Sequence, residues 1–224
     1  MSYVLWLVAG LAASGAEAVQ AGENGLLVDV RQFAPAIALD IRYATADNFT
    51  GRPVPGYAAP KCLLHRPVAE ALARVEQGLR GQGMALVVYD CYRPTVSVDA
   101  FMAWAKDPDQ STKARYYPEL DKSVLVPDYI AERSGHSKAA TVDVGLLDCR
   151  SVTCRPFDMG TAFDYFGPRA NTAYPEINPE QRENRRILLD AMAAGGFENY
   201  PMEWWHFTWR AGPLPDAAYA FPVE

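Results

Sequence analysis

Residues 84–89 form a continuous apolar run that ends at Asp90, a pattern typical of a buried strand. Apolar spacing predicts further strands at residues 26–30, 38–43, 141–147 and 204–209. Helix patterns with start and stop signals lie at residues 67–79, 95–106 and 178–195. Because strands and helices do not alternate strictly, the sequence predicts an α+β fold with a mainly antiparallel sheet flanked by helices.

The composition is that of an ordinary globular protein. The chain has 224 residues, of which 50% are hydrophobic and 21% charged, enough for one well-buried core. The net charge of -6, with no long basic run, argues against a nucleic-acid partner. A single domain is therefore expected. The polar segment 107–122 is predicted to lie on the surface.

The N-terminal segment differs in composition from the rest of the chain. Residues 3–13 are almost unbroken apolar sequence, and the small residues SGAEA follow at 14–18. This pattern predicts a signal peptide at residues 1–18 and a mature domain at 19–224, exported to the periplasm. A run of roughly a dozen residues is too short to span a bilayer. No Lys or Arg precedes it, so a membrane tether or a misassigned start remains an alternative. The mature chain is predicted to have no membrane span.

The four cysteines fit an exported protein, because oxidising compartments preserve disulfides. Cys149 and Cys154 bracket a short polar loop that a disulfide could close, and Cys62 and Cys91 are the remaining candidates for a bridge. Four cysteines allow three pairings, and the sequence alone does not choose among them. A zinc–thiolate site is the rival interpretation, which the absence of any C-x2-C spacing disfavours.

Two of the three histidines stand near carboxylates in the sequence. His136 precedes Asp143 by seven positions, and His206 follows Glu203 by three. Two imidazoles and one aspartate suit a catalytic zinc whose fourth position is open to water. Seven extended residues span about 23 Å, so His136 and Asp143 can share one ion only if the chain folds back between them. A turn is therefore expected within residues 137–140.

Glu203 and Arg93 are candidates for the chemistry itself. Positions three apart in a strand face opposite ways, so Glu203 must lie at a bend before the strand to share a cleft with His206. A glutamate there could take a proton from metal-bound water and pass it to the leaving amine. Arg93 follows the buried strand and could stabilise an oxyanion. A surface glutamate and a structural ion pair are the simpler readings. His65, at a predicted helix start, is not expected to be a ligand.

At these residues the chain resembles a known family, the D-alanyl-D-alanine dipeptidases (VanX-like zinc D,D-dipeptidases). The resemblance extends from about residue 43 to the C-terminus, and its blocks occur in order. They are YAT at 43–45, DNFTG at 47–51, DCYRP at 90–94, SGHSKAATVD at 134–143, MGTAFD at 159–164, EWWH at 203–206 and FPV at 221–223.

The resemblance implies a role for each matched position. It implies one zinc per chain, bound by His136, Asp143 and His206. It also implies that Glu203 is the general base and that Arg93 stabilises the transition state. Asp164 corresponds to the position that binds the substrate's ammonium group, and Ser134 and Tyr43 to positions that contact the substrate. The implied fold is that of the hedgehog/D,D-peptidase group, with residues 19–224 as the catalytic domain.

The chain departs from the family pattern at three positions. Ala139 replaces a glycine between the first histidine and the aspartate; if that glycine has positive φ, Ala139 is strained by about 1 kcal/mol. Thr141 replaces an alanine. Cys91 replaces the glycine of the family's DGYRP, which supports a Cys62–Cys91 bridge as a hypothesis and puts the placement of Arg93 in question.

The expected reaction is hydrolysis of D-alanyl-D-alanine to two D-alanines. It would serve to scavenge or recycle cell-wall dipeptide, or to remove the target of a glycopeptide antibiotic. A carboxylate that binds a free ammonium favours a dipeptide over a longer chain. The alternatives are a D,D-carboxypeptidase acting on peptidoglycan stem peptides and a catalytically silent zinc- or peptidoglycan-binding module. An intact Glu203 argues against a silent module. The sequence makes no prediction of oligomeric state.

Overall fold

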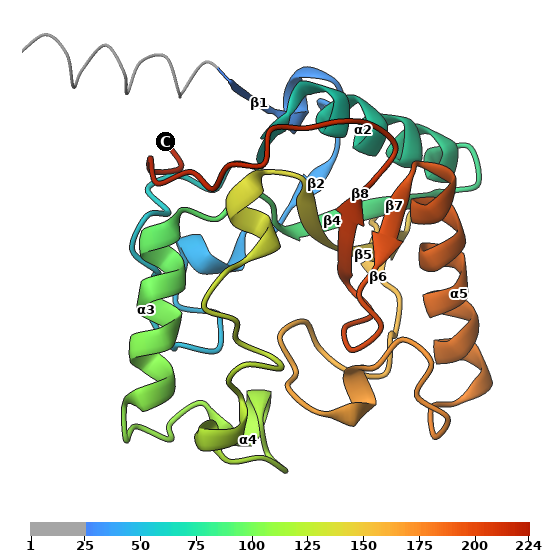
Figure 1. Cartoon of the computed structure of the whole chain (residues 1–224). Coiled ribbons are helices and arrows are strands. Elements are labelled where there is room, and N and C mark those ends of the chain that lie inside the picture. The colour runs from blue at the N-terminus through green and yellow to red at the C-terminus, as the bar shows by residue number, and fades with distance from the viewer. Residues whose placement is uncertain (1–25) are drawn as a thin grey trace, which may run out of the picture.

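The computed structural model describes residues 26–224, so the predicted signal peptide lies outside the described residues. A central sheet crosses the molecule, and a small antiparallel sheet pairs β1 (Leu27–Asp29) with β3 (Leu63–His65) (Figure 1). The central sheet has the strand order β2 (Ala38–Leu39), β4 (Met84–Asp90), β5 (Thr141–Asp148), β8 (His206–Trp209) and β7 (Phe197–Asn199), and β6 (Arg155–Pro156) pairs with β5.

The strands β4, β5, β8 and β7 pair antiparallel in that order, and β2 pairs parallel with β4. The two middle strands, β4 and β5, are buried over most of their length. The prediction of a buried strand at residues 84–89 is therefore confirmed. Its apolar side chains form the core with helix α2 (Arg66–Arg80), which packs against β4.

The other helices of the described chain are α3 (Thr95–Lys106), α5 (Pro179–Ala194) and the short α4 (Lys113–Tyr116). Helix α2 contacts α5, and α3 lies at the opposite end of the molecule from α5 (Figure 1). A capping box starts α5: Asn178 Oδ1 accepts from Gln181 N–H at 2.8 Å, and Gln181 Oε1 accepts from Asn178 N–H at 3.1 Å. The predicted mixture of helices and strands is present, with the three long helices close to their expected positions.

The predicted strand at residues 38–43 is wrong beyond Leu39. Residues Arg42–Ala44 form the 3-10 helix η2, which the backbone bond from Ala44 N–H to Ile41 O closes at 3.2 Å. The Arg42 guanidinium stabilises this turn because it pairs with Asp40 at 2.7 Å and Asp47 at 2.8 Å. The turn directs Tyr43 into the interior, where its side chain is buried.

The prediction that residues 107–122 lie on the surface is also wrong in part. Helix α4 lies within them and buries Tyr116. Lys122 is buried as well, and its ammonium donates to the carbonyls of Trp104 at 3.1 Å and Asp107 at 3.0 Å and lies 4.0 Å from the centre of the Trp104 ring. A cation with these partners can be buried, which a polarity pattern does not reveal.

All four cysteines form disulfides, Cys62–Cys91 and Cys149–Cys154, with Cα–Cα distances of 5.1 and 4.2 Å. The expected pairings are confirmed. Between residues 26 and 224, no helix combines the length and apolar character needed to cross a bilayer.

Arg185 of α5 connects the helix to the loop that precedes it. Its guanidinium is buried and donates to three carbonyl oxygens, of Met159 at 2.7 Å, Asn171 at 2.6 Å and Arg169 at 2.9 Å. Burial lowers the pKa of Arg185 to about 10. Because Met159 and Asn171 stand at the two ends of the segment 159–171, Arg185 holds the whole segment against α5.

Replacement of Arg185 tests this role. We expect Arg185→Ala to lower the free energy of unfolding by about 3 kcal/mol, because buried carbonyl groups lose their donors. The control is Arg186→Ala, which removes only exposed ion pairs to Glu183 and Asp190 and should change stability by less than about 1 kcal/mol. Urea denaturation of both variants measures the difference; equal losses would contradict the assignment.

Candidate active site

The register of the central sheet aligns three polar side chains. Asp90 of β4 is the cross-strand partner of Asp143 of β5, and Asp143 is the partner of His206 of β8. Cross-strand partners share one face of a sheet, with Cβ atoms about 4.5–5.5 Å apart. Two aspartates and a histidine from three distant parts of the sequence therefore meet on one face.

His136 reaches the same place from a turn. It lies in the 3-10 helix η4 (Gly135–Lys138), where Ser134 Oγ accepts from the His136 backbone N–H at 3.2 Å. Ala139 ends this turn with φ of 54°, and β5 begins two residues later. The predicted fold-back between His136 and Asp143 is confirmed. Ala139 occupies the left-handed region, as anticipated, at a cost of about 1 kcal/mol.

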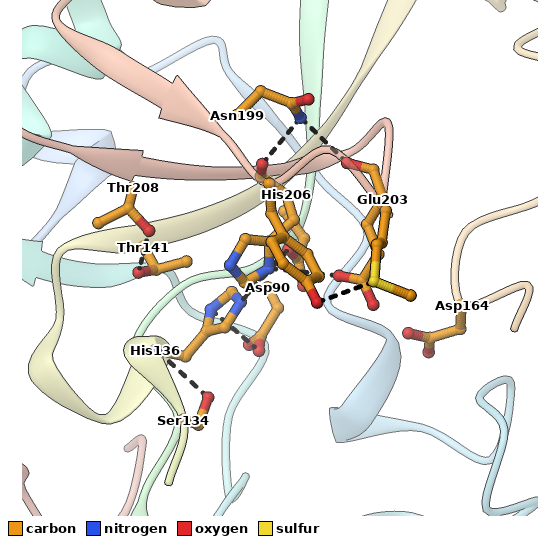
Figure 2. A network of polar contacts seen from close by, with 12 residues as sticks. Asp90, Ser134, His136, Thr141, Asp164, Asn199, Glu203, His206 and Thr208 are labelled. Carbon is orange, nitrogen blue, oxygen red and sulfur yellow. Dashed lines mark hydrogen bonds and ion pairs between the residues drawn. The ribbon is translucent and has the colours of Figure 1, made fainter. Parts of the chain in front are cut away.

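Three donor atoms, from His136, Asp143 and His206, converge in a triangle, and Figure 2 shows the two histidines side by side. The distances are 3.3 Å from His136 Nε2 to Asp143 Oδ1, 3.1 Å from His206 Nδ1 to Asp143 Oδ1, and 3.3 Å between the two nitrogens. Ligands that surround a tetrahedral zinc at about 2.0–2.2 Å are about 3.4 Å apart, so one ion of this size fits the triangle. Asp143 Oδ1 is buried and accepts no hydrogen bond from the described residues, which leaves it available to a metal.

The surroundings prepare these groups for a cation. Burial opposes ionisation of Asp143, but the neighbouring His136 and His206 outweigh it and lower the pKa of the carboxyl. His136 Nδ1 donates to the carbonyl of Cys91 at 2.7 Å, which leaves the Nε2 lone pair facing the triangle. The side chain of Asn199 donates to the carbonyls of His206 and Glu203, each at 3.0 Å (Figure 2).

Glu203 stands beside the triangle at a bend, as predicted. Strand β8 begins at His206 rather than at residue 204, since a turn closed by Glu203 N–H donating to Tyr200 O at 3.0 Å precedes it. The Glu203 carboxylate is 3.5 Å from His206 Nδ1 and only 12% exposed. Burial raises the pKa of Glu203 to about 7, against the opposing effect of His206. A carboxyl with this pKa can both accept and return a proton near neutral pH.

Arg93 approaches from the other side. Its guanidinium pairs with Asp90 Oδ2 at 2.8 Å, lies 3.7 Å from Asp143 Oδ2, and rests over the rings of Tyr43 and Phe101 at 5.1 and 5.0 Å. The replacement of the family's glycine by Cys91 therefore leaves Arg93 at the site.

Asp90 ends a predicted strand and begins the matched block at 90–94, but the sequence predicted no role for it. The structure shows it buried, with Oδ1 accepting from Tyr57 O–H at 2.7 Å and Oδ2 held by the Arg93 guanidinium. Its position three residues before Arg93, at the end of a buried strand, was the available signal. The Cys91 carbonyl and the Asn199 amide had none, because a backbone oxygen has no sequence signature and Asn199 lies outside the matched blocks.

Asp164 faces the cluster from the side (Figure 2). It is 4% exposed and adopts φ of 63°; its Oδ1 accepts from Tyr43 O–H at 2.9 Å, whereas its Oδ2 is buried without a hydrogen-bond partner among residues 26–224. Burial, reinforced by the charge of Asp143, raises the pKa of Asp164 well above its usual range. A carboxyl in this state is stabilised as an anion by a cation that enters the site.

One cavity of about 300 Å³ joins these groups. Every site residue predicted from the sequence lines it: Tyr43, Arg93, Ser134, His136, Asp143, Asp164, Glu203 and His206. His65 does not; its Nε2 lies 3.5 Å from Tyr219 Oη in a separate buried contact. Aromatic side chains form much of the remaining wall, namely Phe49, Phe101, Tyr129, Phe166, Tyr200 and Trp205.

A two-histidine, one-aspartate donor set lies with a glutamate and a guanidinium around one small cavity, an arrangement that defines a metal-dependent hydrolase. Comparison with known proteins gives the family. The family model Peptidase_M15, described as D-ala-D-ala dipeptidase, matches residues 23–224. The chain belongs to this family.

Individual curated relatives support the same family assignment. The chain is 37% identical to a D-alanyl-D-alanine dipeptidase of Enterococcus faecium, over 83% of this chain and 92% of the relative. It is 38% identical to one of Streptomyces coelicolor over 87% and 96%, and 36% identical to one of Enterococcus faecalis over 90% and 100%. Among solved structures, a zinc complex of a D,D-pentapeptidase VanY mutant matches at 15% identity and a TM-score of 0.39, covering 68% of this chain and 76% of that one; this likeness is too distant to support an inference.

The donor triangle is tested by metal binding. We expect His136→Ala and Asp143→Ala to lose stoichiometric Zn²⁺, because each removes one of three ligands. His65→Ala, a change at the one histidine outside the cavity, should retain it. Equilibrium dialysis against Zn²⁺ followed by elemental analysis compares the variants; full metal content in both ligand variants would contradict the site.

Proposed function

We propose that this chain is a zinc-dependent dipeptidase that hydrolyses D-alanyl-D-alanine to two D-alanines. The observation that carries the proposal is the convergence of three metal-ligand atoms, Glu203 and a buried unpaired oxygen of Asp164 on a single small cavity. The curated relatives, which bear this activity in their names, support it.

The zinc ligands in this proposal are His136 Nε2, Asp143 Oδ1 and His206 Nδ1. When bound, zinc supplies a coordinated water acidic enough to ionise near neutral pH. Glu203 is the base that takes this proton and returns it to the amine of the departing D-alanine. Burial raises the pKa of Glu203, which favours the proton transfer to this carboxylate.

Arg93 stabilises the negative charge that develops on the carbonyl oxygen during attack. Its contact with Asp90 fixes the guanidinium in the cavity wall, and the Tyr43 and Phe101 rings restrict it further. A cation that is already in position loses little freedom when the charge forms, so its effect on the transition state is larger than that of a mobile one.

Asp164 selects the substrate in this proposal. Its free Oδ2 binds the ammonium of a free dipeptide, whereas an N-acylated or longer peptide presents a neutral amide and leaves the charge unpaired. Tyr43 orients Asp164 through its hydroxyl, and Ser134, which lines the same cavity, contacts the substrate. The size of the cavity, about 300 Å³, suits two small residues.

The wider organisation is proposed on separate grounds. Residues 19–224 form a single catalytic domain of the hedgehog/D,D-peptidase type with a mainly antiparallel sheet, a proposal supported by the pairing of β4, β5, β8 and β7. Residues 1–18 are a signal peptide that directs the chain to the periplasm. Two disulfides support export, because such bonds persist in oxidising compartments.

The role of Glu203 predicts a separation of metal binding from turnover. Glu203→Gln should retain Zn²⁺ and lose kcat by about 10²–10⁴-fold, because the proton acceptor is removed and the ligands are not. The matched control is Glu198→Gln on β7, where the carboxylate is exposed and pairs with Arg210. Steady-state release of D-alanine measures both; activity in Glu203→Gln within tenfold of the parent would refute the assignment.

Asp164 is tested by substrate preference. For the parent we expect rapid cleavage of D-Ala-D-Ala, little cleavage of N-acetyl-D-Ala-D-Ala, and loss of both activities with a chelator. Asp164→Asn keeps the side-chain shape but removes the charge, so kcat/KM for the free dipeptide should fall at least a hundredfold while zinc content is unchanged. Equal cleavage of free and N-acetylated substrate by the parent would instead indicate a D,D-carboxypeptidase.

A further inference from the structure

The segment that leaves β4 contacts the candidate metal site through Asp90, Cys91 and Arg93. Asp90 holds the Arg93 guanidinium, the Cys91 carbonyl accepts from His136 Nδ1 at 2.7 Å, and the Arg93 backbone N–H donates to the His136 carbonyl at 3.2 Å. Small movements of residues 90–93 would therefore change both the orientation of a zinc ligand and the position of the proposed oxyanion cation.

This segment lies where the β4 ladder ends. The register of β4 against β5 becomes irregular between Val88 and Asp90, so the regular sheet bonds do not fix the residues that follow. Beyond Asp90, the attachments of this segment to the fold include the bond from Tyr92 N–H to Leu63 O at 3.1 Å, the bond from Tyr92 O–H to Phe221 O at 2.7 Å and the Cys62–Cys91 disulfide. Of these, the disulfide is the one covalent link, and it lies next to the carbonyl that His136 contacts. Cys62 is itself fixed, because its carbonyl accepts from Val30 N–H at 3.0 Å.

The two disulfides of the chain differ in position. Cys62 and Cys91 are 0% and 1% exposed, within the core beside the site. The bond between Cys149 and Cys154 closes the exposed loop 150–153 after β5. Cys149 follows Asp143 by six residues, and six residues of extended strand span about 20 Å. One disulfide can act on the metal site directly, and the other serves as an internal control.

We propose that the Cys62–Cys91 disulfide is a positioning element of the active site. It fixes the Cys91 carbonyl that selects Nε2 of His136 as the metal-facing nitrogen, and it fixes the chain that carries Arg93. The inference rests on the proposed function, in which His136 is a zinc ligand. Groups that orient a metal-bound histidine through its second nitrogen affect metal affinity or activity by about 10–100-fold.

The proposal predicts a specific split in the kinetics. Loss of the disulfide should weaken Zn²⁺ binding about tenfold and, at saturating Zn²⁺, lower kcat about tenfold. KM for D-Ala-D-Ala should change less than about twofold, because the backbone that carries Asp164 belongs to the segment 159–171, which Arg185 anchors to α5. A purely structural disulfide would lower the melting temperature without this split.

The experiment compares Cys62→Ala/Cys91→Ala with Cys149→Ala/Cys154→Ala. Zn²⁺ affinity is measured by competition with a chromophoric chelator, and kcat, KM and melting temperature follow on the same samples. Cys62→Val/Cys91→Ala, which refills buried volume, replaces the first variant if that is too unstable to purify. Absorption spectra of Co²⁺-substituted protein provide a readout independent of turnover and should change only for the Cys62–Cys91 variants.

The proposal would be overturned if the Cys62–Cys91 variants kept zinc affinity and kcat within twofold of the parent and an unchanged Co²⁺ spectrum. Equal effects in the variants of both disulfides would also overturn it. Failure of the proposed function has another signature: the disulfide-intact parent would itself bind no Zn²⁺ or leave D-Ala-D-Ala uncleaved.

Discussion

The structure depends on a buried carboxylate oxygen placed between two imidazole nitrogens. Asp143 Oδ1 lies 3.1 and 3.3 Å from the ring nitrogens of His206 and His136 and accepts no hydrogen bond within the described chain. Such an oxygen is costly to bury unless a cation meets it. The sheet register, the η4 turn and the bend at Glu203 all serve to bring these atoms together, which explains why Ala139 is kept in a left-handed conformation at the entry to β5.

The charges of the site would balance only when a metal ion and a substrate are bound. Four carboxyl groups, of Asp90, Asp143, Asp164 and Glu203, lie around the guanidinium of Arg93 at this site. A divalent ion and a substrate ammonium would bring the positive charge that is otherwise missing. Burial, reinforced by the charge of Asp143, raises the pKa values of Asp164 and Glu203. In the proposed function, metal and a free dipeptide would therefore be bound by parts of one electrostatic arrangement, which would link specificity to catalysis.

Much of this was predictable from sequence, and the exceptions have physical reasons. Spacing predicted the fold-back after His136 and the bend at Glu203, because side chains that share one site must meet whatever the chain does between them. The β4 strand followed from its apolar run. The strand expected at residues 38–43 failed because the ion pairs of Arg42 favour a turn, and Lys122 is buried because carbonyls satisfy it. The contribution of Cys91 is a backbone carbonyl, so only the folded chain reveals it.

X-ray absorption at the zinc edge of the purified protein tests the central claim most directly. The account predicts one zinc with nitrogen and oxygen ligands at about 2.0–2.1 Å, including two imidazoles, and no sulfur, because all four cysteines are in disulfides. A sulfur shell at about 2.3 Å, or zinc without imidazole scattering, would contradict it.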